Sequence, residues 1–249
     1  MAHITKTEIT EFRGTPKVIA NCKTPEGTAS YPHINKPDEP VYNGVKGKKQ
    51  YKVDLRVDPK DAESATFMEE VRVWEDKAKI TQRTNLEAEL AKCKGARDVE
   101  KKDKYEAMLK AIDDGKYKSL LQTEYDRDSG DPTGMMLIKS KMNAEGKGAD
   151  GPYTMEPKVY NATGRVQLAD APQITPASTL RLNLELGTYE MFASGYVGIS
   201  VRLKDVLIVK IAESGGAGGS NPFGGDNAQQ PDTFNASAGL DETSDSDEY

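Results

Sequence analysis

The residues best suited to catalysis are few and scattered in this chain. It contains two histidines, His3 near the amino terminus and His33 in a proline-rich stretch. Its two cysteines, Cys22 and Cys93, lack the CxxC or CxH spacing of a zinc site. A general base or a metal centre needs such groups close together. The sequence therefore predicts no enzyme activity, no metal and no cofactor, and both cysteines are expected to be reduced thiols.

Two further patterns could suggest chemistry, but a structural explanation is stronger for each. The paired carboxylates Glu69–Glu70 and Asp113–Asp114 lie in charged, helix-forming sequence, where solvated surface is the usual explanation. The Gly-rich stretch from Ser214 to Gly225 lacks the Lys-Ser/Thr ending of a P-loop. Its composition predicts a flexible linker, which we place at residues 214–231.

A third group of residues favours binding of single-stranded nucleic acid. Where strands are expected, the side away from the core carries Lys, Arg and amide groups near aromatic rings. Cations can follow a phosphate backbone while rings stack on unpaired bases. Any antiparallel sheet with a solvated face can show the same pattern, so this alternative stays open. The candidate DNA-binding residues are Lys48, Lys52, Arg56, Lys139, Lys141, Arg181, Asn183, Tyr189, Phe192, Arg202 and Lys204.

Periodicity in the first half indicates which elements would position these residues. Strict alternation over residues 48–57 predicts a strand with one core face and one largely basic face. Apolar residues recur at helical spacing over residues 61–94, and residues 95–122 continue in helix-forming composition, so we expect a helical insertion over about 61–122. Prolines between residues 13 and 45 predict short strands joined by loops.

The second half is expected to be rich in strands. Alternation predicts strands near residues 135–142, 180–189 and 197–211, and a hairpin with its corner at Gly164. In the last strand, alternate residues from Val197 to Ile211 are expected on one face. Helices do not alternate with strands, which argues against a parallel sheet. We predict a mainly β fold, an OB-type barrel of about five to seven antiparallel strands with a capping helix, an inserted helical arm and a disordered acidic tail.

Charge separates the chain into a body and a tail. The last 39 residues contain no Lys or Arg and carry eight of the 40 acidic residues, so the formal charge of −6 divides into about +2 and −8. We expect a binding domain at 1–213 and a tail at 232–249 that can imitate a polyanion, with a solubilising role as the alternative. No apolar run could span a bilayer, so no membrane association is expected. The tail residues expected to bind partners are Asp241, Glu242, Asp245, Asp247, Glu248 and Tyr249.

The order of several segments resembles the single-stranded-DNA-binding proteins that short-tailed bacteriophages encode. The resemblance covers most of the chain, and the acidic tail with its terminal aromatic residue completes it. The matching segments are Ala29–Asp38, Gln50–Leu55, Phe67–Lys77, Thr133–Met142, Leu180–Leu184, Gly187–Phe192 and Gly198–Val209.

This resemblance implies an OB fold that binds single-stranded DNA with little sequence preference during phage replication and recombination, in the cytoplasm of the infected bacterium. The chain departs from the family pattern at Asn183, where relatives tend to carry a second cation, and at Asn143, where an aromatic residue is expected. The DNA contacts that the resemblance implies are Lys139, Lys141, Arg181 and Tyr189, with Tyr189 as a base-stacking ring and Phe192 nearby.

The resemblance also implies partners for the tail. These are phage DNA polymerase and helicase-primase, and the tail is expected to fold back on the DNA groove when DNA is absent. Exchange of tails between copies would make a homodimer plausible. Alternative functions are a strand-annealing or recombination mediator that uses the same groove, and a structural protein of virion assembly. A metal-dependent nuclease would need a carboxylate cluster that the sequence does not visibly assemble.

Overall fold

The computed structural model divides the chain into two compact units, Met1–Glu213 and Ser214–Tyr249. All described residues belong to the first unit, so the Gly-rich linker and the acidic tail lie outside them. Neither helix of the described part carries an apolar stretch of the length that a bilayer requires. The structure describes residues 2–12, 15–93, 98–148, 151–164, 166–192 and 194–212.

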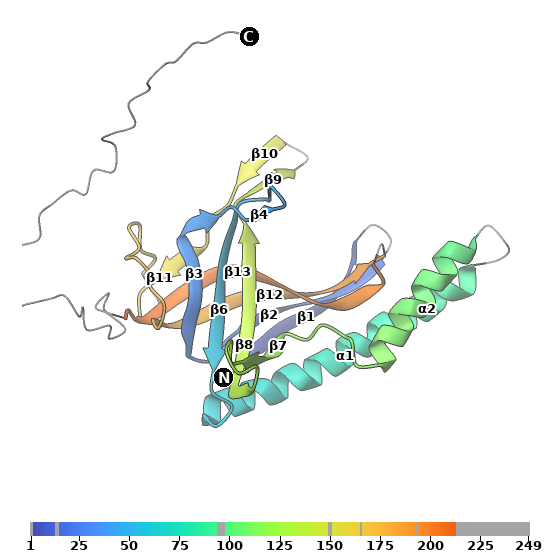
Figure 1. Ribbon diagram of the computed structural model, residues 1–249, viewed down its shortest axis with the longest axis horizontal. Helices are drawn as coiled ribbons and strands as arrows, with labels where there is room; N and C mark the ends of the chain where they lie inside the picture. Colours follow the sequence, from blue (N-terminus) through green and yellow to red (C-terminus); the bar gives the residue numbers. More distant parts are fainter. Residues whose placement is uncertain are drawn as a thin grey trace, which may run out of the picture. The chain divides into compact units, whose positions relative to one another are not determined.

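The described residues form mostly β-structure, together with two helices (Figure 1). The helices are α1 (Ala62–Lys92) and α2 (Val99–Asp113). The strands are β1 (Ile4–Phe12), β2 (Thr15–Lys23), β3 (Gly27–Asp38), β4 (Val41–Tyr42), β5 (Val45–Lys46), β6 (Gln50–Val57), β7 (Leu121–Tyr125), β8 (Pro132–Asn143), β9 (Glu145–Gly148), β10 (Gly151–Thr154), β11 (Lys158–Tyr160), β12 (Thr179–Met191) and β13 (Tyr196–Lys210).

Five strands close into a barrel in the order β3-β6-β8-β13-β12. The barrel closes because β12 pairs with β13 along its length and with β3 at its beginning. All of these pairings are antiparallel except that of β8 with β13, where Arg202 lies opposite Lys141. A closed five-stranded barrel with this strand order is the OB fold, and the predicted fold class is confirmed.

The sheet extends beyond the barrel, with nine strands in the described residues. The hairpin of β1 and β2 continues from β12, β7 pairs with β8, and β11 pairs with β13. The pairings of β13 with β8 and with β11 are parallel. The expected number of about five to seven strands therefore fits the barrel and not the whole sheet, and the expectation that all strands are antiparallel was wrong at these two pairings.

The proline-rich region contains longer strands than the sequence predicted. Pro16 lies in β2, and Pro32 and Pro37 lie in β3, which is twelve residues long. The pairing of β3 with β6 shifts register between Ser30 and His33 and again between His33 and Asp38. A proline removes one donor from the ladder. In β3 the prolines interrupt the pairing without ending the strand, so the prediction of short strands was wrong for β2 and β3.

Helix α1 caps the barrel as predicted. Asp61 is its N-cap and accepts a hydrogen bond from the backbone N–H of Ser64 at 2.9 Å. No Gly or Pro interrupts the sequence from residue 60 to residue 94. The predicted stripe of Phe67, Val71, Trp74 and Ala78 is buried in the same core as the barrel strands. The helix continues past the barrel beneath β1 and β2 (Figure 1).

Helix α2 ends earlier than the sequence predicted. It stops at Asp113, and Gly115 follows with a φ of +69°, a conformation that ends helices and suits glycine. The chain then runs extended along β13, where Lys118 pairs with Gly198. The predicted helix to residue 122 was therefore wrong, because residues 121–125 form β7.

The β12–β13 pair confirms one predicted face and corrects another. Leu180, Leu182, Leu184 and Leu186 are all buried, as expected. The register shifts after Asn183, because Asn183 pairs with Asp205 and Leu184 pairs with Leu203. The extra residue in β13 is a β-bulge that reverses the alternation. The expectation that one face continues from Val197 to Ile211 was therefore wrong beyond Leu203.

The predicted hairpin corner at Gly164 is confirmed, with a φ of +67°. The backbone N–H of Asn161 donates to the carbonyl of Val166 at 3.1 Å. After the corner, the returning segment pairs with β11 through a single bridge between Tyr160 and Gln167.

Candidate nucleic-acid interface

A row of cations crosses the outer face of the barrel. Lys52 on β6 lies opposite Lys141 on β8, and Lys141 lies opposite Arg202 on β13. Neighbouring strands are about 4.8 Å apart, so the three cations follow one another at strand spacing. We call Lys52, Lys141 and Arg202 the cationic row. His33 on β3 continues it beyond Lys52, because those two residues are also paired in register.

The side chains of this face point outward because the strands alternate strictly. In β6, Tyr51, Val53, Leu55 and Val57 are buried, so the residues between them face solvent. In β8, Ile138, Ser140 and Met142 are buried, which leaves Lys139 and Lys141 exposed. The prediction that β6 carries a core face and a basic face is confirmed.

Carboxylates already pair with most of the cationic row. Lys52 Nζ lies 2.5 Å from Asp38 Oδ2 and holds the pKa of that carboxyl below its usual range. Glu185 on β12 forms ion pairs with Arg202 at 3.6 Å and with Lys204 at 3.3 Å. These pairs are largely solvated, and such pairs contribute only about 0–1 kcal/mol. A phosphate group could therefore replace the carboxylates at small cost.

Asp54 brings a negative charge into the face beside the cationic row. It lies opposite Lys139 in the β6–β8 register and opposite Ser30 on the other side. Burial raises the pKa of Asp54, while Lys139 and Lys52 act in the opposite direction. Asp54 is thus a partly desolvated carboxylate next to two lysines.

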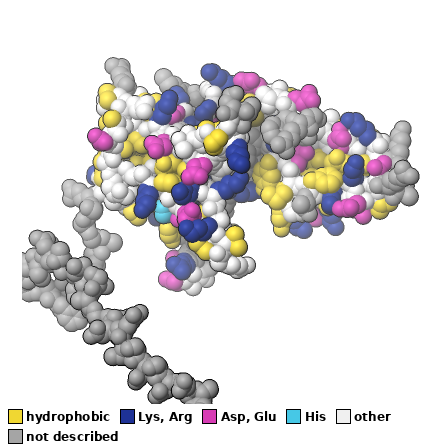
Figure 2. All heavy atoms as spheres, turned by 90° about the horizontal axis from the view of Figure 1, so that it is seen from above, with side chains coloured by type: hydrophobic (Ala, Val, Ile, Leu, Met, Phe, Trp, Pro, Cys, Tyr) yellow, Lys and Arg dark blue, Asp and Glu magenta, His cyan; other side chains and the backbone are white. Residues whose placement is uncertain are grey.

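Two hairpins rise where the outer face ends. The β4–β5 hairpin joins β3 to β6, and Lys48 is exposed in the segment that leads back into β6. The β9–β10 hairpin follows β8. The two hairpins are joined near the barrel by an ion pair between Lys49 and Glu145 at 3.5 Å. We use the name helical arm for α2 together with the end of α1 on which it packs. Figure 2 is seen from the hairpin side and shows dark blue side chains gathered between the barrel and this arm.

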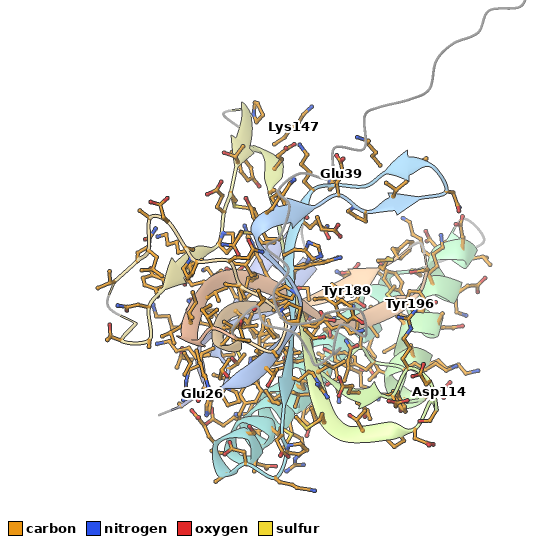
Figure 3. The ribbon with its side chains drawn as sticks, turned by 60° about the vertical axis from the view of Figure 1, so that its left-hand side comes forward. Glu26, Glu39, Asp114, Lys147, Tyr189 and Tyr196 are labelled. Carbon is orange, nitrogen blue, oxygen red and sulfur yellow. The ribbon has the colours of Figure 1, made fainter. Side chains whose placement is uncertain are left out.

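Tyr189 lies on the same outer face of the β12–β13 ribbon as Arg202. The register pairs Glu185 with Arg202 and Tyr189 with Gly198, so Tyr189 is four residues, or roughly 14 Å, further along the ribbon. Its side chain is partly buried, and this burial raises its pKa. Figure 3 shows Tyr189 and Tyr196 at the same end of the ribbon.

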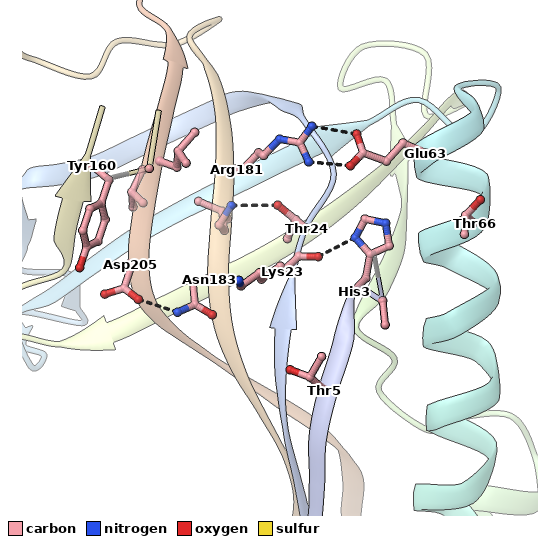
Figure 4. A pocket seen from close by; sticks show the side chains of 15 residues that line it. His3, Thr5, Lys23, Thr24, Glu63, Thr66, Tyr160, Arg181, Asn183 and Asp205 are labelled. Atoms are coloured by element: carbon pink, nitrogen blue, oxygen red, sulfur yellow. Dashed lines mark hydrogen bonds and ion pairs between the residues drawn. The ribbon is translucent and has the colours of Figure 1, made fainter. Parts of the chain in front are cut away.

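Three predicted contacts lie away from the cationic row. Arg56, at the end of β6, is clasped by Glu124, with Nε and Nη2 each 2.8 Å from a carboxylate oxygen. Arg181 and Asn183 line an open cleft of about 790 Å³ on the outside of β12. In Figure 4, Arg181 points toward Glu63 of α1 and Asn183 toward Asp205 of β13.

The side chains of Arg181 and Asn183 are both bound by carboxylates. Arg181 contacts Glu63 at 2.5 and 3.0 Å and Glu26 at 3.1 Å, and these acids raise the pKa of its guanidinium. Asn183 donates to Asp205 at 2.5 Å. A DNA role for Arg56, Arg181 and Asn183 stays a prediction, and it would require phosphate to displace these acids.

Phe192 packs against the helical arm. Its ring meets Tyr105 of α2 edge-to-face with centroids 5.3 Å apart, and Lys104 Nζ lies 5.1 Å from its centroid. The ring remains 36% exposed, so part of one face is still accessible. Its surroundings indicate a packing role at the end of the ribbon, and base contact stays a prediction.

Sequence reasoning missed three residues on this face. His33 was hidden because Pro32 and Pro37 obscure the alternation around it. Lys118 was assigned to a helix, although the buried Tyr117 and Leu120 on either side indicate an ordered segment. Tyr196 begins β13 and is 62% exposed, and the alternation of Val197 and Ile199 could have revealed its outward direction.

The described residues offer binding groups more than reactive ones. No group of three His, Cys, Asp or Glu side chains in the described ranges could hold a metal ion. Cys22 is buried, and burial raises the pKa of its thiol to about 12. The accessible groups of the barrel face are cations and the carboxylates beside them, with amides and aromatic rings at its borders. The tail residues from Asp241 to Tyr249 lie outside the described part of the chain.

The topology and this outer face define an OB-fold protein with a cationic barrel surface. No protein-family model and no curated protein matches the chain. Among solved structures it is similar to gp2.5, a single-stranded DNA-binding protein encoded by bacteriophage T7, with 20% identity and a TM-score of 0.52 over 77% of this chain and 92% of that one. This similarity shows a shared fold, and it confirms at that level the resemblance seen in the sequence.

The single-stranded DNA-binding protein of bacteriophage Enc34 was found as well. In the structure of its complex with single-stranded DNA, that protein is 16% identical in sequence to this chain, with a TM-score of 0.45 over 82% of this chain and 94% of that one. Its C-terminal truncation is 17% identical, with a TM-score of 0.46 over 84% and 97%.

Proposed function

We propose that this protein binds single-stranded DNA with little sequence preference and without catalysing a reaction on it. The observation that carries the proposal is the in-register cationic row of Lys52, Lys141 and Arg202 across three strands of the barrel. The face formed by the second and third barrel strands, here β6 and β8, is the nucleic-acid-binding surface typical of OB folds. The shared fold with T7 gp2.5, described as a single-stranded DNA-binding protein, supports the same function.

The ion pairs on the barrel face suggest how DNA would enter. Phosphates would take the places of Asp38 and Glu185 beside Lys52 and Arg202, and the displaced carboxylates would return to solvent. Lys139 and Lys141 form no ion pair within the described residues, so both could bind phosphate directly. Because these contacts are electrostatic, affinity should fall steeply as salt rises.

Tyr189 would supply the preference for single strands. A tyrosine ring can stack on a base only when that base is free of its own neighbours, as it is in single-stranded DNA. Stacking is largely indifferent to base identity, because every base has a π-face. The cationic row and this ring together would therefore favour unpaired DNA over duplex DNA, with little dependence on the base sequence.

The acidic tail, residues 232–249, would act as a second functional part. Its charge is opposite to that of the body, because residues 232–249 carry six acidic and no basic residues, whereas residues 1–210 have a formal charge of about +2. It would compete with DNA for the cationic face and, with its terminal Tyr249, recruit phage DNA polymerase and helicase-primase during replication and recombination. Exchange of tails between two copies would produce a homodimer. We place this activity in the cytoplasm of the infected bacterium.

Fluorescence anisotropy with labelled oligo-dT and a duplex of matched length tests the binding proposal. The full chain should bind oligo-dT more tightly than duplex at each salt concentration, and affinity should fall with salt at a slope of about 0.7 per phosphate contact. Equal affinity for the single strand, the duplex and heparin would instead indicate a general polyanion binder.

A further inference from the structure

The outer face of the β12–β13 ribbon continues beyond the cationic row toward the helical arm. From Arg202 the register passes through Gly187 opposite Ser200 and Tyr189 opposite Gly198, and it ends with Met191 opposite Tyr196. Tyr196 lies six residues before Arg202 along β13, a distance of roughly 20 Å. The cationic row and the ribbon therefore meet at Arg202.

The far end of this ribbon carries two aromatic rings and a cation on one face. Tyr189 and Tyr196 are diagonal neighbours on paired strands, a distance at which long side chains still interact. Lys118 lies on the other side of Gly198, and it shares the face with Tyr189. A Cβ built on Gly198 would lie 2.5 Å from Lys118 Cβ, which shows how closely the segment passes.

Lys118 is exposed although its neighbours are fixed. The hydroxyl of Tyr117 donates to Gln82 of α1 at 2.7 Å, and the N–H of Leu120 donates to the buried Glu75 at 2.6 Å. Lys118 is exposed, and among the described residues the nearest lysine in sequence with an ion pair is Lys116, which pairs with Asp114, whereas Lys118 forms none. An anchored backbone with a free ammonium group is the arrangement that phosphate binding favours.

The helical arm supports the end of the ribbon. Gln82 of α1 donates to the carbonyl of Tyr189 at 3.1 Å, and Phe192 packs on Tyr105 of α2. A Cβ on Gly195 would lie 3.4 Å from the Cβ of Ala107 in α2. These contacts hold the turn between β12 and β13 in place while Tyr196 stays 62% exposed. The arm therefore packs against the end of the ribbon and supports this surface.

We propose that Tyr196 and Lys118, held by the helical arm, form a second DNA-binding segment that continues the path from the cationic row. This inference rests on the proposed function and extends it. Phosphates cross the barrel along the row and turn at Arg202, and the next bases stack on Tyr189 and Tyr196 while Lys118 binds the phosphate between them. A short oligonucleotide fills the row alone, whereas a longer one reaches both segments.

Oligonucleotide length tests the inference. Binding of a thymidine tetramer and a thymidine dodecamer, both within the range of OB-fold site sizes, is compared for the wild type and for Tyr196→Ala, Lys118→Ala and Lys141→Ala. Tyr196→Ala should weaken dodecamer binding roughly tenfold and leave tetramer binding unchanged. Lys118→Ala should act in the same direction, and Lys141→Ala should weaken both.

Two control variants separate stacking from general surface effects. Tyr196→Phe keeps the ring and should bind the dodecamer as the wild type does. Tyr125→Ala removes a tyrosine of equal exposure, 63% against 62%, from β7 near the β7–β8 turn and should change nothing.

Unchanged dodecamer binding by Tyr196→Ala and Lys118→Ala, together with a loss in Lys141→Ala, would overturn the second segment and leave the proposed function intact. If the wild type bound neither oligonucleotide better than a duplex, the proposed function and this extension of it would both fail.

Discussion

Lys52 and Lys141 lie directly opposite each other on β6 and β8, with both side chains on the outer face of the barrel. Like charges in this position destabilise a sheet. Asp38 relieves Lys52, but Lys141 has Arg202 as its next neighbour. Three neighbouring cations lower the stability of the sheet. Such a concentration of positive charge is expected where an anion binds.

Replacing Lys141 should therefore separate binding from stability. Lys141→Ala removes a phosphate contact, so affinity for oligo-dT should fall roughly tenfold and the salt slope should decrease by about 0.7. Thermal unfolding should be unchanged or occur slightly higher, because a repulsive pair is lost. A clear drop in melting temperature would show instead that Lys141 stabilises the barrel.

Tyr189 should contribute through its ring and hardly through its hydroxyl. Tyr189→Ala should weaken oligo-dT binding by roughly tenfold or more at little cost to stability, and Tyr189→Phe should bind like the wild type. Anisotropy and thermal unfolding measured on the same preparations check both statements. If Tyr189→Ala unfolds the protein, the ring belongs to the core and its assignment to the outer face is incorrect.

Asp54 should oppose DNA binding, and its effect on stability should depend on pH. Burial raises the pKa of Asp54 in the folded state, so the folded protein holds this proton more tightly than the unfolded chain. That contribution to stability is present below the unfolded pKa of about 3.9 and is lost as pH rises through the folded pKa. The ionised carboxylate is then left partly desolvated at neutral pH.

Asp54→Asn should consequently bind oligo-dT more tightly and gain stability relative to the wild type as pH rises. The gain should be modest, about 0.5 kcal/mol, because solvent still screens the carboxylate. Urea unfolding between pH 4 and pH 7 measures it. Serine at position 30, the other neighbour of Asp54, offers a control, since Ser30→Ala changes no charge. A pH-independent difference between Asp54→Asn and the wild type would contradict the assigned cause.

Removing the acidic tail should strengthen DNA binding where electrostatics dominate. Deletion of residues 232–249 removes six acidic residues and brings the formal charge from −6 to zero, so affinity for oligo-dT should rise severalfold at low salt and converge with that of the full chain at high salt. A tail of equal length with its acids replaced by Asn and Gln separates charge from length. Equal affinity of all three proteins at low salt would exclude competition by the tail.

Local alternation was sufficient to predict which residues of a strand face outward. Lys52, Lys139, Lys141 and Arg202 were all found this way, because a period of two survives in any sheet. The helix stripe on α1 was predictable for the same reason, since four apolar residues at helical spacing need a partner surface.

Register and long-range pairing could not be read in the same way. Lys141 and Arg202 are far apart in sequence and meet only because β8 and β13 pair in parallel. Glu63 neutralises Arg181 through a contact between α1 and β12 that no local pattern records. Phe192 and Tyr189 look equivalent in the sequence, yet only Phe192 is packed on α2. Tertiary contacts decide which predicted residues stay available to a ligand.

Charge reversal across the cationic row tests whether this row is the DNA site. The variant with Lys52, Lys141 and Arg202 changed to Glu is compared with one in which Lys101, Lys102 and Lys110, three exposed lysines of α2, are changed in the same way. Both variants have the same net charge, and anisotropy with oligo-dT is measured for each at low salt. The row variant should lose nearly all binding, and the helix variant should keep most of it. Equal losses in the two variants would show that net charge governs binding, and the row would not be the DNA site.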